Sequence, residues 1–138
     1  MRDVAYIALG SNLGDRAHHL ARARDAIAEL PASRVVAESS IEETQPLGWL
    51  EQPMYLNQMV ALETSLTPRQ LLDRLQAIEQ REGRTRHERW ESRTLDLDIV
   101  CFDEQTASDP DLEIPHPGLA DRAFWQRELA ELRREAKR

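Results

Sequence analysis

The sequence contains a single cysteine, Cys101, among its 138 residues. A disulfide within the chain is therefore impossible, which fits a protein of a reducing compartment. Cys101 lies in the apolar run 95–102, where a free cysteine ordinarily behaves as a small buried hydrophobic residue. No window approaches the ~20 apolar residues of a membrane span, and the apolar stretch 4–9 is too short for a signal sequence. We therefore expect a cytoplasmic protein with no membrane partner.

The chain also has no excess of basic residues. Its 25 acidic and 18 basic side chains give a formal net charge of −7, so general attraction to nucleic-acid phosphates is not expected. The glycine-containing segment 10–14 is not followed by Lys-Ser or Lys-Thr, so there is no P-loop. His18 and His19 are adjacent in a predicted helix and cannot face one zinc ion together.

The order of the predicted elements favours an α+β fold. Apolar and β-branched residues predict strands over residues 4–9, 35–41, 55–64 and 95–102. Helical spacing of apolar residues, with capping residues before them, predicts helices over 16–30, 68–82 and 121–138. We expect one domain over residues 1–138 with a ferredoxin-like α/β sandwich. Its antiparallel sheet would carry helices on one face, with an extra C-terminal helix.

Two long polar segments separate these elements. Residues 44–54 contain two prolines and a glycine, and residues 84–94 contain four arginines. Both segments are long for loops in so short a chain, and loops of this length tend to be functional. We therefore expect two surface loops, at about 44–54 and 84–94, that help to build a site.

Two carboxylates are predicted to share one face of the last strand. Asp96 and Asp98 alternate with apolar residues, and successive side chains of a strand point to opposite faces. Their Cα atoms are expected ~6.5–7 Å apart at ~3.3 Å per residue. Carboxylates at this spacing can share magnesium ions, which also take waters and substrate phosphates as ligands. Taken alone, the short acidic pattern is more typical of the polar face of an edge strand.

An arginine-rich segment directly precedes the two carboxylates. Arg84, Arg86, Arg89 and Arg93 lie close together, with Trp90 among them. Guanidinium groups bind phosphate oxygens bidentately, and an indole can pack on a base. Arginines and carboxylates together are what a magnesium–nucleotide site needs. The alternative is a solvated, charged loop without a ligand.

Several motifs along the chain, taken together, resemble one known family. They occupy residues 8–14, 44–48, 52–57, 83–86, 89–90, 93–99 and 114–117. The stretch Arg-Thr-Leu-Asp-Leu-Asp-Ile at 93–99 is the most specific of them. In this order the motifs resemble the 6-hydroxymethyl-7,8-dihydropterin pyrophosphokinases of folate biosynthesis, whose fold is the ferredoxin-like sandwich expected above. The resemblance implies an ATP-dependent diphosphotransferase that moves diphosphate to the pterin hydroxymethyl group and releases AMP.

The resemblance also implies roles for individual residues. Asp96 and Asp98 would be the ligands of two Mg²⁺ ions on the ATP phosphates. Arg84 and Arg93 would engage those phosphates and assist transfer. The expected pterin contacts are Thr44, Leu47, Tyr55, Asn57 and Phe124. The expected nucleotide contacts are Gln76, Glu79, Arg84, Trp90, Arg93, Ile99, His116 and Arg122. Both long loops would be mobile and would close over the bound substrates.

Two other functions stay open on the sequence alone. The family usually has Gly-Pro after the loop tryptophan, whereas this chain has Glu91-Ser92, which would suit a non-catalytic relative that binds pterin or nucleotide. A ferredoxin-like RNA-binding module would use the arginine-rich segment. The net charge of −7 and the lack of an RNP-type aromatic strand argue against that module. We expect a monomer that acts on ATP and a hydroxymethyl-dihydropterin, with no nucleic-acid partner.

Overall fold

A computed structural model describes residues 2–45, 54–82 and 95–136 of the chain. Most of the two expected loops, at about 44–54 and 84–94, lies outside these ranges, as does the Glu91-Ser92 pair. Within the described residues, no helix is long and apolar enough to cross a membrane.

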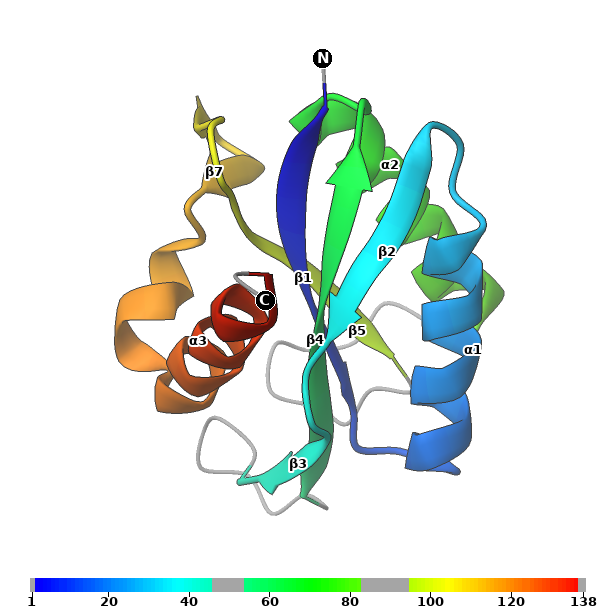
Figure 1. The fold of residues 1–138 in the computed structure, drawn as a ribbon. Helices are drawn as coiled ribbons and strands as arrows, with labels where there is room; N and C mark the ends of the chain where they lie inside the picture. Colours follow the sequence, from blue (N-terminus) through cyan, green and yellow to red (C-terminus); the bar gives the residue numbers. More distant parts are fainter. Residues whose placement is uncertain (1, 46–53, 83–94, 137–138) are drawn as a thin grey trace.

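The centre of the structure is an antiparallel sheet. In the order of the sheet its strands are β2 (Ser33–Glu38), β4 (Tyr55–Thr64), β1 (Asp3–Ser11) and β5 (Asp96–Phe102) (Figure 1). A short strand, β3 (Glu42–Thr44), pairs with β4 on the same edge as β2. All these pairings are antiparallel.

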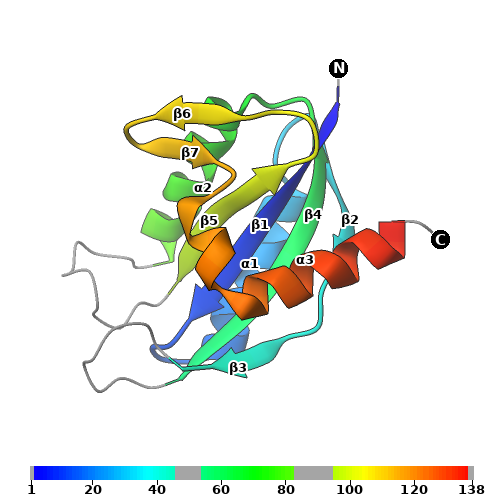
Figure 2. The same ribbon diagram turned by 90° about the vertical axis from the view of Figure 1, so that its left-hand side faces the viewer.

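Two helices cover one face of this sheet and a third covers the other. Figures 1 and 2 show α1 (Arg16–Ala28) and α2 (Pro68–Arg81) on one side, with α3 (Ala123–Ala136) on the opposite side. Without α3, the elements around the four long strands follow the β-α-β-β-α-β order of a ferredoxin-like fold. The predicted fold class is therefore confirmed, including the extra C-terminal helix.

The alternation of side chains along β1 explains why both faces are covered. Ile7 and Leu9 are buried with residues of α1 and α2, whereas Tyr6 and Ala8 are buried with residues of α3. Because successive side chains of a strand point to opposite faces, an uninterrupted apolar strand needs a partner on each side. Cys101 belongs to the α3 side and is buried, as predicted.

Local capping fixes where the first two helices begin. The Asp15 carboxylate accepts a hydrogen bond from the backbone N–H of His18 at the start of α1. At the start of α2, the Thr67 hydroxyl accepts from the Gln70 N–H, and the Gln70 side chain accepts from the Thr67 N–H. This is the capping box that the sequence predicts, and it satisfies two backbone donors that the helix itself leaves unpaired.

Some boundaries differ from the predictions. Strand β1 continues past residue 9, where the predicted strand ends, through Gly10 to Ser11, because β4 pairs with both residues and β5 pairs with Gly10. Thr44 belongs to β3 rather than to a loop. Strand β2 ends at Glu38 instead of residue 41, and α1 ends at Ala28, before the expected stop at Pro31.

A small hairpin and a 3₁₀ helix were not predicted. Strands β6 (Ala107–Asp109) and β7 (Leu112–Ile114) form the hairpin, and η1 (Pro117–Asp121) follows it (Figure 2). The backbone N–H of His116, between β7 and η1, donates to the carbonyl of Val100 in β5 at 2.7 Å. This bond places the start of η1 beside β5. Helix α3 follows η1 in the chain.

Candidate active site

The register of the sheet brings the predicted metal and pterin residues to one place. Gly10 in β1 lies opposite Asn57 in β4 and opposite Asp96 in β5. Ala8, two residues earlier, lies opposite Asp98. Directly opposed residues share a face of the sheet, and Ala8 packs on the α3 side. The two carboxylates and Asn57 therefore lie on the face of the sheet that α3 covers.

Gly10 provides the space in which these side chains meet. A Cβ atom at this position would lie 3.3 Å from Oδ1 of Asn57 and 3.4 Å from Cδ1 of Tyr55. The absence of a side chain therefore lets both residues lie close over β1. The Tyr55 hydroxyl crosses this gap and donates to Oδ2 of Asp96 at 3.3 Å. Gly10 lies just beyond the predicted strand 4–9, and only the observed strand pairing reveals this role.

The pterin contacts expected on β3 and β4 lie together. Thr44 is directly opposite Tyr55 in the β3–β4 pair, and the Asn57 side-chain amide donates to the Thr44 hydroxyl. Asn57 is buried, whereas Thr44 and Tyr55 are half-buried. An amide, a hydroxyl and a phenol at one site can offer both hydrogen-bond donors and acceptors to a heterocycle. Leu47, also expected at the pterin, lies outside the described residues.

His116 and the beginning of α3 lie next to Asp98. The His116 Nε2 atom is 3.8 Å from Oδ1 of Asp98, and the imidazole meets the Trp125 ring edge-on at 4.9 Å. The Arg122 guanidinium stacks over Trp125, 4.3 Å from the ring centroid. Phe124 packs against the same indole at 6.1 Å. Sequence analysis missed Trp125, which the structure shows as the common support of three predicted site residues.

The tautomer of His116 follows from its hydrogen bonding. Nδ1 accepts a hydrogen bond from the Gly118 N–H at 2.9 Å, so the proton of the neutral ring is on Nε2, the atom that faces Asp98. Burial lowers the pKa of His116, and the positive charge of Arg122 lowers it further. His116 therefore offers Asp98, or a ligand beside it, a neutral N–H donor.

Three expected nucleotide contacts lie apart from this group. Glu79 in α2 is buried, and its carboxylate accepts from the backbone N–H of Leu97 at 2.7 Å. Ile99 packs in the core between the sheet and the helices α1 and α2. Gln76 is exposed on α2. These residues lie on the α2 side of the sheet, whereas the pterin contacts lie on the α3 side; β5 is the last strand in the order β2-β4-β1-β5. The predicted nucleotide residues that the structure describes thus form two groups, on the two faces of the sheet at β5.

The carboxylate pair fits magnesium in its chemistry. Asp96 is half-buried, and the Asp98 side chain is 41% exposed, so both are accessible to a ligand. Within the described ranges, no three His, Cys, Asp or Glu side chains form a group that could hold a metal ion. Magnesium does not need such a group, because it commonly binds one or two carboxylates and completes its shell with water and phosphate oxygens. Arg84, Trp90 and Arg93 lie outside the part of the chain that the structure describes.

A buried carboxyl group of α3 lies near the expected pterin contacts. Glu128 of α3 is 1% exposed, and neither of its carboxyl oxygens has a partner at hydrogen-bond distance among the described residues. Burial, followed by the neighbouring carboxyl of Glu42 in β3, raises the pKa of Glu128 to about 9. Arg127, the preceding residue of α3, forms an ion pair with Glu42 at 2.7 Å. With a pKa of about 9, Glu128 keeps its proton at neutral pH.

Comparisons of the sequence with known proteins point to one family. The family model for 7,8-dihydro-6-hydroxymethylpterin-pyrophosphokinase matches residues 6–134. Two relatives named 2-amino-4-hydroxy-6-hydroxymethyldihydropteridine pyrophosphokinase are similar over most of the chain. The Pseudomonas aeruginosa protein is 47% identical over 127 residues, which are 92% of this chain and 78% of that protein. The Bacillus subtilis protein is 44% identical over 132 residues, which are 96% and 79% of the two chains.

A solved structure supports the fold. The chain is similar to the one described as "Crystal Structure Analysis of the HPPK-DHPS in complex with substrates", with a TM-score of 0.64 and 15% identity. The match covers 88% of this chain and 38% of that much longer one. At this identity the likeness concerns the fold alone, whereas the family match rests on the sequence. The chain belongs to the 7,8-dihydro-6-hydroxymethylpterin-pyrophosphokinase family.

Proposed function

We propose that this chain transfers diphosphate from ATP to the hydroxymethyl group of 6-hydroxymethyl-7,8-dihydropterin and releases AMP, a reaction of folate biosynthesis. One observation carries the proposal. Asp96 and Asp98 share a face of the sheet with Tyr55 and Asn57, across the open position at Gly10. A phosphate-binding metal site and a site for a hydrogen-bonding ring are thereby adjacent, as transfer between two bound substrates requires.

The pterin would bind on the α3 side of the sheet. Tyr55 and Phe124 provide aromatic surface for the ring, while Asn57 and Thr44 offer hydrogen bonds to its polar edge. The Thr44–Asn57 hydrogen bond holds the amide in one orientation before the substrate arrives. Leu47 is assigned to the pterin only by the family resemblance. This arrangement would orient the hydroxymethyl oxygen toward the carboxylates.

Asp96 and Asp98 would hold two magnesium ions on the phosphates of ATP. When bound, these ions supply positive charge that offsets the charge of the triphosphate and of the transferring group. The Tyr55 hydroxyl restrains Asp96, and His116 lies beside Asp98, so each carboxylate has a neighbour that limits its rotation. Magnesium fits this site because both carboxylates provide oxygen ligands and both are accessible.

The nucleotide would bind along the edge of β5. Gln76, Glu79 and Ile99 lie on the α2 side of this strand, while His116 and Arg122 lie on the α3 side. ATP bound across the edge would reach both groups, with its phosphates at Asp96 and Asp98. Arg84, Arg93 and Trp90 complete the proposed nucleotide contacts by resemblance to the family.

The reaction would be a displacement at the β-phosphorus. The hydroxymethyl oxygen forms a bond to that phosphorus while the bond to the oxygen bridging the α- and β-phosphates breaks, so AMP leaves with this oxygen. No strong general base is placed at the hydroxymethyl group, and a loose transition state does not require one. We further propose that the chain acts as a monomeric, single-domain enzyme of the cytoplasm.

The test is pterin-dependent formation of AMP from Mg-ATP. The parent protein is expected to form AMP only when the pterin is present. Asp98→Asn should lower the rate by about a hundredfold or more, since removing a charged group that acts on the transition state typically has effects of this size. Asp111→Asn is the matched control, because Asp111 is an exposed partner of Arg69 far from the site.

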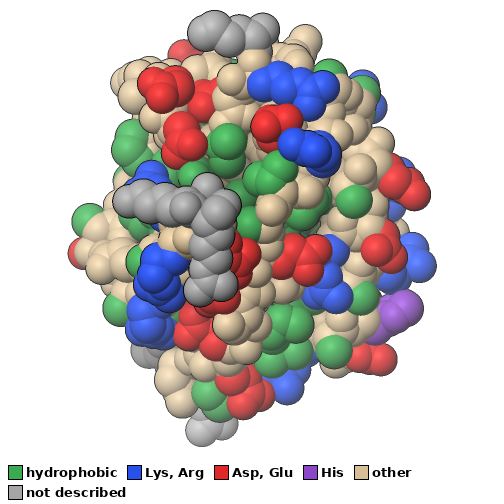
Figure 3. Space-filling model, in the orientation of Figure 1, with side chains coloured by type: hydrophobic (Ala, Val, Ile, Leu, Met, Phe, Trp, Pro, Cys, Tyr) green, Lys and Arg blue, Asp and Glu red, His purple; other side chains and the backbone are tan. Residues whose placement is uncertain are grey.

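Two outcomes would redirect the proposal. Binding of the pterin without AMP formation would indicate a non-catalytic relative. RNA binding that is tight, salt-dependent and independent of magnesium would indicate an RNA-binding module instead. On the face drawn in Figure 3, the described acidic and basic side chains are interspersed rather than separated by sign, which does not favour a nucleic-acid surface.

A further inference from the structure

Arg16, the first residue of α1, joins three elements that lie near the pterin contacts. Its Nη1 atom donates to the backbone carbonyl of Met54 at 2.7 Å and forms an ion pair with the Glu43 carboxylate at 3.0 Å. Met54 immediately precedes β4, and Glu43 is the middle residue of β3. The side chain of Arg16 is 29% exposed, so water shields these contacts only in part.

Both partners of Arg16 are neighbours of expected pterin contacts. Glu43 precedes Thr44, and Met54 precedes Tyr55. In the register, Thr44 and Tyr55 are directly opposed at the end of the β3–β4 pair. Arg16 therefore binds the residue before Thr44 and the residue before Tyr55. These contacts lie at the end of the β3–β4 pair, where strands ordinarily fray.

Strand β3 has few other stabilising contacts among the described residues. It has three residues, and in the described part of the chain it pairs only with β4. Successive side chains point to opposite faces, and each of its two glutamates meets an arginine from a helix. Glu42 binds Arg127 of α3 at 2.7 Å, and Glu43 binds Arg16 of α1 at 3.0 Å. The short strand is thus held from both faces by charged contacts.

We infer that Arg16 is a positioning residue for the pterin side of the site. By holding the carbonyl of Met54 and the carboxylate of Glu43, it keeps Thr44 and Tyr55 opposed and the Thr44–Asn57 hydrogen bond in place. It does not reach Asp96, Asp98 or the nucleotide residues by any contact in the described structure. Its loss should therefore weaken binding of the pterin and leave binding of ATP nearly unchanged. The inference rests on the proposed function, because it assumes that Thr44, Tyr55 and Asn57 bind the pterin.

The test compares Arg16→Met with the parent protein, using equilibrium binding of each substrate and steady-state kinetics. Methionine keeps much of the aliphatic length of arginine and removes the charge and the donors. The pterin Kd and KM should rise about five- to tenfold, which is the size of the usual net contribution of one hydrogen bond. The ATP Kd should change by less than about twofold, because no contact among residues 2–45, 54–82 and 95–136 connects Arg16 to that side.

A conservative variant separates positioning from a general loss of structure. Both contacts of Arg16 come from one nitrogen, so the single ammonium of Arg16→Lys can donate to the carbonyl and to the carboxylate. This variant should recover most of the pterin affinity. Arg16→Met and Glu43→Gln should be non-additive in pterin Kd, because each removes the same ion pair.

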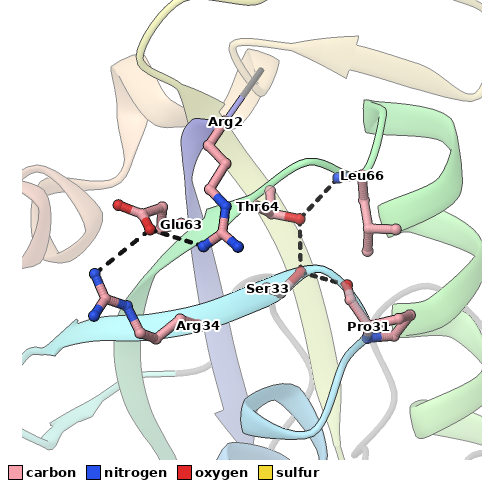
Figure 4. A network of polar contacts seen from close by, with 7 residues as sticks. All are labelled: Arg2, Pro31, Ser33, Arg34, Glu63, Thr64 and Leu66. Atoms are coloured by element: carbon pink, nitrogen blue, oxygen red, sulfur yellow. Dashed lines mark hydrogen bonds and ion pairs between the residues drawn. The ribbon is translucent and has the colours of Figure 1, made fainter.

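Arg34→Met is the matched control. Arg34 lies on β2 near the end of β4 remote from Tyr55, where it and Arg2 bind Glu63 (Figure 4). The control removes one arginine charge and should leave both affinities unchanged. Suppose that the parent protein is active. If Arg16→Met then weakens binding of the pterin and of ATP equally, or weakens neither, the inference is overturned. A parent that neither binds the pterin nor forms AMP would instead refute the proposed function and the inference together.

Discussion

Replacing Glu128 with glutamine should make the protein more stable at neutral and alkaline pH. Burial and the adjacent Glu42 raise the pKa of Glu128 from 4.5 to about 9. The unfolded chain loses this proton near pH 4.5, whereas the folded protein keeps it until the pH approaches 9. Between these values the folded state binds one more proton than the unfolded state, so the free energy of unfolding falls as the pH rises. Glutamine has the same shape, stays neutral and removes this dependence.

The size of the effect follows from the two pKa values. Each pH unit inside the window lowers the free energy of unfolding by about 1.4 kcal/mol. At pH 7 the loss attributable to Glu128 is therefore about 3 kcal/mol, and at pH 5 it is below about 1 kcal/mol. Small domains have a total stability of about 5–15 kcal/mol. An effect of this size is large enough to measure by denaturant unfolding.

The assay is urea unfolding of the parent and of Glu128→Gln at several pH values from 5 to 8. The difference in unfolding free energy between the two proteins should grow by about 4 kcal/mol across this range. Glu135→Gln, an exposed position on the same helix, is the control and should follow the parent curve. Parallel curves for the parent and Glu128→Gln would show that Glu128 is not protonated in the folded protein, and would refute this reasoning.

Two further predictions concern a helix start and the imidazole beside the carboxylates. Thr67→Ala removes half of the capping box of α2 and should lower the unfolding free energy by about 1 kcal/mol in urea titrations, whereas Ser65→Ala, at an exposed residue, should change it by less than about 0.5 kcal/mol. An unchanged Thr67→Ala midpoint would count against the cap. His116 should titrate below its usual range in NMR, and Arg122→Gln should raise its pKa because it removes a nearby positive charge. A lower value in Arg122→Gln would contradict this assignment.

The main outline of the fold could be predicted from the sequence because its signals are local. The capping box at Thr67 and Gln70, and the apolar run before Gly10, each depend on a few neighbouring residues. Strand β3 could not be predicted, since its three residues form a strand only by pairing with β4. The same holds for the hairpin of β6 and β7, whose short strands pair with each other.

For the site, the carboxylate pair shows which part can be predicted from the sequence and which part cannot. Alternation along one strand is enough to place Asp96 and Asp98 on the same side. The position of Asp96 across β1 from Asn57, however, depends on the register of three strands, and Gly10 is the residue between them. Trp125 was missed for the same reason, because its role comes from contacts with His116 and Arg122 rather than from its neighbours in sequence.

The central claim is that a diphosphate, and not a single phosphate, moves from ATP to the pterin. The most direct measurement uses ATP labelled separately in the β- and γ-phosphates, with magnesium and 6-hydroxymethyl-7,8-dihydropterin present. If diphosphate is transferred, both labels appear in the pterin product and the nucleotide product is unlabelled AMP. Release of β-labelled ADP with only the γ-label on the pterin, or no transfer of either label, would contradict it.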